Sequence, residues 1–234
     1  LEQALKLAKK ISKDGNTEEA KCIYQDILIK FSKNKKAIAG LKELADNYLN
    51  LGNALQIEGK FKEAIETYKL ALSINYNKAI IYNNLGIALD AKGYKEKAII
   101  SFKKALSIKP DYADCYANIG NTLIKEKKIE EAIKALDKAV SINQNNANYY
   151  NSMGNAFHIQ GNFSKSVIYF KKALSLIPNN ADCHANLSNS LQLQGNFEEA
   201  IKVAKKAISI NPKLTESYNN LGTLYKSLDK IYEE

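Results

Sequence analysis

Carboxamide side chains recur along this chain at a regular spacing, which makes them the first candidates for a chemical role. Asparagines lie 34 residues apart, and often again three residues later, at Asn50, Asn53, Asn84, Asn118, Asn121, Asn155, Asn186, Asn189 and Asn220. A primary amide offers two N–H donors and one carbonyl acceptor, the same kinds of group that a peptide backbone presents. Such a row therefore predicts hydrogen bonding to the main chain of an extended polypeptide, largely independent of its side chains.

Inheritance is the competing explanation of this recurrence. Asparagine is a mediocre helix former, because its amide competes for nearby backbone groups, so its repeated use inside helical segments needs a reason. The chain holds 26 asparagines, and duplication of a repeat would copy them without selection. The binding interpretation is favoured because neighbouring solvent-facing positions carry mainly lysine.

Residue types for catalysis or metal binding form no comparable pattern. No nucleophile lies beside a base, and there is no phosphate-binding loop. Cys22, Cys115 and Cys183 are widely spaced without a paired CxxC motif, and His158 and His184 are the only histidines. We therefore expect no metal, no cofactor and no enzyme activity within these residues. Unpaired cysteines are simplest to explain in a reducing, cytoplasmic location.

The charge balance raises a nucleic-acid alternative. The formal net charge is +9, yet all 34 basic residues are lysine, so arginine, which suits bidentate phosphate and guanine contacts, is absent. Paired lysines such as Lys103–Lys104 and Lys171–Lys172 are expected to face solvent on the side away from the asparagines, which leaves only a weak, salt-sensitive attraction to nucleic acid. No apolar run approaches the roughly 20 residues that a membrane span needs, so no membrane partner is expected.

The asparagine spacing belongs to a repeat of 34 residues that fills a single array over residues 1–234. The predicted repeats are 1–34, 45–78, 79–112, 113–146, 147–180 and 181–214, with a partial repeat at 215–234. Ten of the eleven glycines fall at repeat positions eight and fifteen, where they predict a close helix contact and a left-handed helix end. The three prolines fall at position thirty-two, just before the next helix.

Two apolar stripes at helical spacing predict two antiparallel helices in each repeat, and hence an all-α fold. In the repeat that begins at Ala79, the first stripe includes Tyr82 and Leu85, and the second includes Phe102 and Leu106. Positions six and nine, which hold the asparagines, project opposite the first stripe. Residues 35–44 are an insertion that extends the second repeat, and its pattern predicts one long first helix from about Lys35 to Glu58. This extension either braces the first repeat or forms a contact surface.

These features resemble the tetratricopeptide repeat. The shared positions are an aromatic residue at four, Leu-Gly at seven and eight, Ala at twenty, an aromatic residue at twenty-four, Ala at twenty-seven and Pro at thirty-two. The departures are Ala4, Ala8, Lys127, Ser166 and Ser188. The resemblance covers nearly the whole chain, and it implies a solenoid that forms a right-handed superhelix of antiparallel helix pairs. In that family the first helices line a concave surface, which here would be the asparagine-lined groove.

A second resemblance concerns the asparagines themselves. The runs NLGN (50–53), NIGN (118–121) and NLSN (186–189) are similar to the tetratricopeptide arm of O-linked N-acetylglucosamine transferases, whose asparagine ladder grips substrate polypeptide. The resemblance implies a peptide-binding scaffold, or more narrowly the substrate-recognition arm of a larger transferase that continues beyond residue 234. Repeat position two carries the acidic residues Asp46, Asp114, Asp182 and Glu216. They either complement the helix dipole or contact hydroxyl or basic ligand side chains.

Two alternatives remain beside the protein-protein interaction scaffold. The chain could be an architectural module that forms homo-oligomers through its extended helix or an uncapped end, or a weak nucleic-acid binder through its lysines. Capture of a C-terminal carboxylate, known in other tetratricopeptide proteins, is not expected in the repeats from 45 to 214. Positions two, five and six carry no basic residue there.

Overall fold

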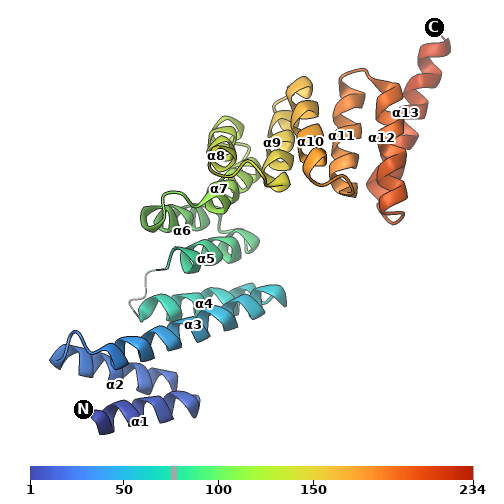
Figure 1. Ribbon diagram of the computed structural model, residues 1–234. Coiled ribbons are helices and arrows are strands. Elements are labelled where there is room, and N and C mark those ends of the chain that lie inside the picture. Colours follow the sequence, from blue (N-terminus) through green and yellow to red (C-terminus); the bar gives the residue numbers. More distant parts are fainter. Residues whose placement is uncertain (75–77, 234) are drawn as a thin grey trace. The chain divides into compact units, whose positions relative to one another are not determined.

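The computed structural model describes residues 1–74 and 78–233, with the side chains of residue 216 and residues 228–233 excepted. The described part contains 13 α-helices and no strand, as the sequence predicts (Figure 1). The chain divides into two compact units, Leu1–Pro110 (unit 1) and Asp111–Glu234 (unit 2). Each unit is a stack of helix pairs.

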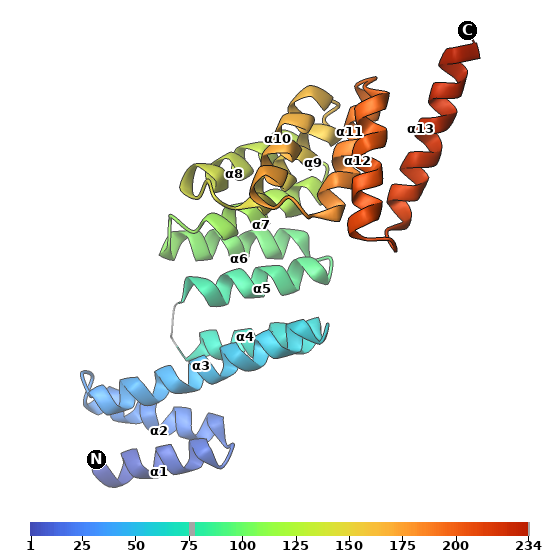
Figure 2. The same cartoon turned by 45° about the vertical axis from the view of Figure 1, so that its right-hand side comes forward.

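Unit 1 contains six helices. They are α1 (Glu2–Lys13), α2 (Thr17–Lys30), α3 (Lys35–Ile57), α4 (Phe61–Ser73), α5 (Ala79–Ala91) and α6 (Lys95–Ile108). The helices pack in pairs, α1 with α2, α3 with α4 and α5 with α6, and α3 is visibly the longest of them (Figure 2). Contacts between α2 and α3 and between α4 and α5 join one pair to the next.

Unit 2 contains seven helices in the described residues. They are α7 (Ala113–Lys125), α8 (Ile129–Ile142), α9 (Ala147–Ile159), α10 (Phe163–Leu176), α11 (Ala181–Leu193), α12 (Phe197–Ile210) and α13 (Thr215–Glu233). The first helices contact one another as well as their partners, α7 with α9, α9 with α11 and α11 with α13. Helix α13 is 19 residues long.

The turns between paired helices show why glycine recurs at position fifteen. Gly161 and Gly195 have φ angles of 81° and 84°, in the left-handed region. Lys127 occupies the same position and also adopts a left-handed φ of 61°. A side chain there costs about 1–2 kcal/mol, so the fold imposes this backbone shape even without glycine. Asparagine occurs instead at N-terminal helix ends. The Asn162 side chain, for example, caps α10 by accepting a hydrogen bond from the Lys165 N–H.

Glycine at position eight lets the two helices of one repeat approach closely. A Cβ atom on Gly154 would lie 2.6 Å from the ring of Phe170. In the repeat 181–214 a serine takes this position, and the facing residue is small. Ser188 is fully buried, its hydroxyl donates to the Ala200 carbonyl at 2.9 Å, and Ala204 takes the place of the aromatic residue.

The insertion at residues 35–44 forms the first three turns of α3, as the sequence predicts, and its glycine has a specific partner. A Cβ on Gly40 would lie 2.3 Å from Tyr24 of α2, just as a Cβ on Gly52 would lie 2.5 Å from Tyr68 of α4. Helix α3 therefore packs against the helix before it and the helix after it. Tyr24 uses Gly40 because its own repeat carries Ala8 in place of glycine.

The position-four tyrosines, predicted to be core residues, differ in burial. Tyr150 is 1% exposed and stacks on Tyr169, whereas Tyr218 is 49% exposed. For Tyr218 the core prediction is wrong, because within the described residues α13 contacts only α11 and α12. His184, which takes position four of its repeat, is half-buried with Nε2 2.9 Å from the Pro178 carbonyl oxygen. All three cysteines are free.

Candidate functional site

Two of the predicted asparagines lie in one hollow of unit 2. Asn118 and Asn121 of α7 line a space of about 310 Å³ together with Asp114, and α9 contributes Tyr149 and Ser152. These α7 residues occupy positions two, six and nine, which the helical periodicity places on one face. The chain has 34 basic residues, yet none of them lines this hollow. It therefore offers amides, a phenol and one carboxylate.

A hydrogen bond between two residues that line the hollow holds the Tyr149 hydroxyl in place. The Tyr149 hydroxyl donates to the Asp114 carboxylate. Burial, and then the neighbouring Asp114, raise the pKa of Tyr149, so the phenol stays protonated at neutral pH. The Asp114 side chain is exposed and forms no ion pair with a lysine in the part of the chain that the structure describes. This carboxylate can accept further hydrogen bonds from a ligand.

Four carboxamides of unit 2 make no hydrogen bond to the described residues. They are Asn121, Asn155, Asn186 and Asn189, all half-buried on α7, α9 and α11. Asn220 on α13 donates to the Ala185 carbonyl, but at 3.5 Å, the outer limit of a hydrogen bond. A half-buried amide that is partly shielded from water and has no protein partner gains from a ligand that supplies one.

The predicted asparagines of unit 1 are used differently. Asn53 accepts hydrogen bonds from the Tyr68 hydroxyl at 2.9 Å and from the Asn84 side chain at 2.8 Å. Asn84 in turn accepts from Asn83 at 3.3 Å. Asn50 is exposed. The structure thus brings Asn53 and Asn84 together, but they bond to each other and to a core tyrosine.

The acidic residues at position two also differ between repeats. Asp46 forms an ion pair with Lys78, so its charge is balanced within unit 1. Asp114 bonds to Tyr149 as described, and Asp182 is exposed. The side chain of Glu216 lies outside the described residues.

His158, at repeat position twelve, belongs to a polar network between repeats. Its Nδ1 lies 2.8 Å from Ser190 Oγ, which lies 2.9 Å from Ser166 Oγ, and Ser166 donates to the Gly154 carbonyl at 2.9 Å. Burial lowers the pKa of His158, so the neutral ring is favoured. The serine that replaces alanine at position twenty thus has a partner that sequence reasoning missed, because the partner comes from another repeat.

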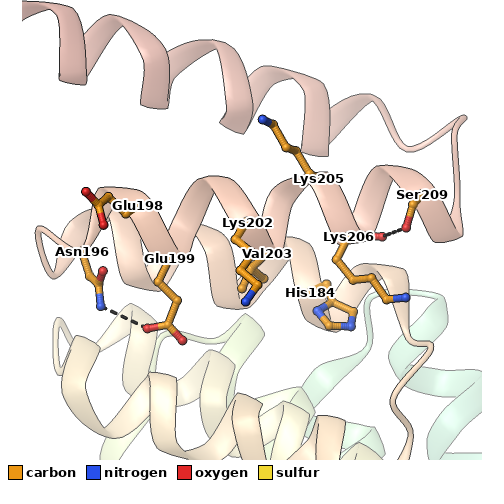
Figure 3. A pocket seen from close by; sticks show the side chains of 9 residues that line it. All are labelled: His184, Asn196, Glu198, Glu199, Lys202, Val203, Lys205, Lys206 and Ser209. Carbon is orange, nitrogen blue, oxygen red and sulfur yellow. Dashed lines mark hydrogen bonds between the residues drawn. The ribbon is translucent and has the colours of Figure 1, made fainter.

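A second hollow lies on the second-helix side of unit 2 and has a volume of about 920 Å³ (Figure 3). It is lined by His184 and by α12, whose acidic residues Glu198 and Glu199 precede Lys202, Lys205 and Lys206. Figure 3 shows Lys205 pointing away from Lys202 and Lys206, and Asn196 donating to Glu199 at 3.1 Å. Lys171 and Asn196 already bond to Glu199, so this hollow is a weaker candidate than the amide row.

The paired lysines of the second helices have structural partners. The Lys104 ammonium lies 5.7 Å from the centre of the Tyr82 ring, and that of Lys172 lies 4.6 Å from the Tyr150 ring. Lys171 pairs with Glu199 at 2.8 Å. Three of the four lysines in these two pairs thus have a cation-π contact or an ion pair within the chain.

Across residues 1–74 and 78–233, no three His, Cys, Asp or Glu side chains gather as potential metal ligands. Within the same ranges, no helix combines the length and the apolar character that crossing a membrane requires.

Protein-family models match most of the chain. Models described as tetratricopeptide repeat match residues 43–111, 147–180 and 169–202, and one described as TPR repeat matches residues 120–161 and 189–229. The chain belongs to the tetratricopeptide repeat family. It is an all-α tetratricopeptide solenoid and, as such, a protein-protein interaction scaffold. No curated protein matches its sequence.

Several solved tetratricopeptide structures are similar. A MamA protein shares 25% identity and a TM-score of 0.61, covering 74% of this chain and 94% of its own. YrrB, described as a TPR protein with an unusual peptide-binding site, shares 26% identity and a TM-score of 0.61, covering 79% of this chain and 95% of its own. TTC0263, a thermophilic TPR protein of Thermus thermophilus, shares 20% identity and a TM-score of 0.64, covering 77% and 98%, which supports the fold alone.

Proposed function

We propose that this tetratricopeptide protein binds an extended protein segment along the asparagine row of unit 2. The observation that carries the proposal is the set of unpaired carboxamides at Asn121, Asn155, Asn186 and Asn189 on successive first helices. Each amide can donate to a peptide carbonyl and accept from a peptide N–H. Because main-chain groups are common to all sequences, the row would bind extended segments with little sequence preference.

The hollow at Asn118 adds a limited side-chain preference. Asp114 and the carboxamides offer acceptors, and no lysine lines the hollow. A ligand side chain with a hydroxyl or a basic group is therefore preferred there over an acidic one. The peptide-binding site in the description of YrrB supports the general proposal by analogy.

The role of a transferase arm is a narrower form of the same proposal. It rests on the NIGN and NLSN runs and on the position-two aspartates. In that form the bound segment would be a substrate polypeptide, and this chain would be non-catalytic.

The experiment begins with a random library of unstructured dodecapeptides, from which peptides that bind the whole chain are selected. Their affinities are then measured by fluorescence anisotropy for the wild type and for the Asn155→Ala, Asn189→Ala double variant. Loss of two hydrogen bonds of about 1 kcal/mol each predicts a loss of affinity of about 30-fold. The amides point away from the core, so the unfolding temperature is expected to be unchanged.

A matched control replaces two exposed loop asparagines, Asn145 and Asn179, with alanine. This variant removes the same groups from the same unit and is expected to bind as the wild type does. Equal affinity of the Asn155, Asn189 variant and the control would refute the proposal.

Self-association through the extended helix is a second candidate, favoured by an apolar hollow of unit 1. This space of about 600 Å³ is lined by Leu28 and Ile29 of α2 and by Ile38 and Leu41 of α3. Ile29 is 81% exposed, which is unusual for isoleucine. Concentration-dependent sedimentation that Ile29→Lys abolishes, while the Asn155, Asn189 variant retains it, would support this role.

A further inference from the structure

A hollow of about 380 Å³ lies between α1 and α3 in unit 1, and its chemistry is opposite to that of the Asn118 hollow. Lys6 and Lys9 of α1 and Lys36 of α3 line it, together with the carboxylates of Glu2 and Glu43. Lys6 and Lys9 occupy repeat positions six and nine of α1, where the later repeats carry mostly asparagine. The row of amides is thus replaced by ammonium groups on this helix.

The charges in this hollow are only partly balanced. Lys36 pairs with Glu2 at 2.8 Å, and this contact lowers the pKa of Glu2. Lys6 and Lys9 form no ion pair within the described residues. They lie one turn apart on the same helix, where two like charges repel each other. An anion between them would relieve this repulsion.

Tyr24 places a neutral hydrogen-bond donor at the same hollow. The side chain is 5% exposed, and its hydroxyl, which stays open to solvent, makes no hydrogen bond in the described part of the chain. It lines the hollow beside Gly40, where a Cβ would lie 2.3 Å from the ring carbon that carries the hydroxyl. Glycine at this position therefore keeps the hydroxyl accessible. Burial, and then the charge of Glu43, raise the pKa of Tyr24, so the group remains a donor.

We propose that the α1–α3 hollow binds a side-chain carboxylate of an acidic peptide segment through the Lys6 and Lys9 ammonium groups and the Tyr24 hydroxyl. A carboxylate has about four acceptor sites, so it can accept from all three donors. Such charge-assisted hydrogen bonds are stronger than neutral ones. Glu43 also lines the hollow, and its charge opposes a carboxylate at the Tyr24 hydroxyl, so the attraction of the Lys6 and Lys9 ammonium groups must exceed this repulsion.

This inference is independent of the amide row. The two sites lie in different units, share no residue and select ligands of opposite character. Failure of one proposal therefore leaves the other unaffected, and the Asn155→Ala, Asn189→Ala variant is expected to bind acidic peptide normally.

The probe is a fluorescein-labelled nonapeptide, Gly-Ser-Glu-Gly-Glu-Ser-Gly-Glu-Gly, compared with the same peptide carrying Gln for Glu. The whole chain is titrated at low salt, as wild type and as Lys6→Gln, Lys9→Gln. Removal of two exposed ion pairs predicts a loss of affinity of about fivefold to tenfold. Tyr24→Phe, which retains the ring against Gly40, predicts a loss of about tenfold, as for a hydrogen bond to a charged group.

The matched control is Lys10→Gln, Lys13→Gln, which removes the same charge from the same helix outside the hollow. It is expected to bind within about twofold of the wild type. Equal losses in the two lysine pairs would overturn the proposal, because only net charge would then matter. An unchanged affinity of Tyr24→Phe at an unchanged unfolding temperature would also overturn it, as would equal binding of the glutamine peptide.

Two further ligands, phosphate and RNA, test whether the site is specific for a peptide carboxylate. Inorganic phosphate is compared with sodium chloride of equal ionic strength, and displacement of the peptide by phosphate alone would overturn the choice of a carboxylate. An oligouridylate RNA whose binding required Lys6, Lys9 and Tyr24, in the absence of peptide binding, would overturn the choice of a protein partner.

Discussion

The two units carry asparagine at the same repeat positions but use it differently. In unit 1, Asn53 bonds to Tyr68 and Asn84, whereas in unit 2 the equivalent Asn155 has no hydrogen bond to the described residues. The difference comes from position twenty-four, which holds Tyr68 in one repeat and Phe170 in the other. A single phenolic oxygen reaches the asparagine in unit 1. Repeat position alone therefore does not determine whether a carboxamide is available to a ligand.

Position twenty-four also controls packing, and the largest expected effect concerns this role. Ala204→Phe would place a ring against Ser188, whose side chain occupies the space that Gly154 leaves for Phe170. Overpacking of this kind costs about 1–3 kcal/mol of unfolding free energy. Urea unfolding measures this loss. Labelling of Cys183 follows unit 2 specifically, because this thiol is buried and burial raises its pKa to about 12.

The matched rescue is Ser188→Gly in the Ala204→Phe background. It re-creates the glycine-aromatic pair of the other repeats and is expected to recover most of the lost stability. A double variant as unstable as Ala204→Phe alone would show that the two positions do not compensate each other.

A smaller effect tests the use of asparagine as a structural residue in unit 1. Asn53→Ala would leave the buried Tyr68 hydroxyl with only Gln56, at 3.2 Å, and would remove the acceptor of Asn84. We expect a loss of about 0.5–1.5 kcal/mol in unfolding free energy, whereas Asn155→Ala should change it by less than about 0.5 kcal/mol. Both are measured by urea denaturation. Equal losses would remove the distinction between the units.

The sequence predicts the helix pairs, the long α3 and the glycine contacts because these follow from local periodicity and backbone conformation. Lys127 illustrates the strength of the repeat pattern, since it takes a left-handed φ in place of glycine. The pairing of Gly40 with Tyr24 and the network of His158 with two serines could not be predicted. They depend on which side chains come into contact across different repeats. No simple spacing in a single sequence indicates these contacts.

The candidate site shows the same division. The helical period predicts that positions six and nine share a face. It does not predict that the Tyr68 hydroxyl donates a hydrogen bond to the Asn53 side chain. Nor does it indicate that Lys6 and Lys9 line the same hollow as Tyr24, because the tyrosine lies on another helix.

A substitution can give unit 2 the tyrosine that unit 1 carries at position twenty-four, and a binding measurement shows its effect. Phe170→Tyr adds the phenolic oxygen that Tyr68 carries, and its expected partner is Asn155, as Asn53 is for Tyr68. Peptides selected on the wild type should then bind about threefold to fivefold more weakly, because one carboxamide is occupied. Fluorescence anisotropy measures the affinity. The same loss in a Phe170→Tyr, Asn155→Ala variant relative to Asn155→Ala alone would show that the oxygen acts by another route.

The smallest expected effect uses histidine, which occurs only in unit 2. Burial lowers the pKa of His158 in the folded chain, so on acidification the unfolded chain takes up a proton first. The stability from the neutral ring is complete above the unfolded pKa of about 6.5, and it is lost as the pH falls from there toward the lowered folded value. Unfolding of unit 2, followed by Cys183 labelling at pH 7.5 and 5.5, should therefore be easier at pH 5.5. His158→Gln should reduce this difference, while His184 is present in both proteins and its contribution cancels. An identical pH dependence in the variant would mean that the Ser166–Ser190–His158 network tolerates the proton, and that its bond to Ser190 does not depend on a neutral ring.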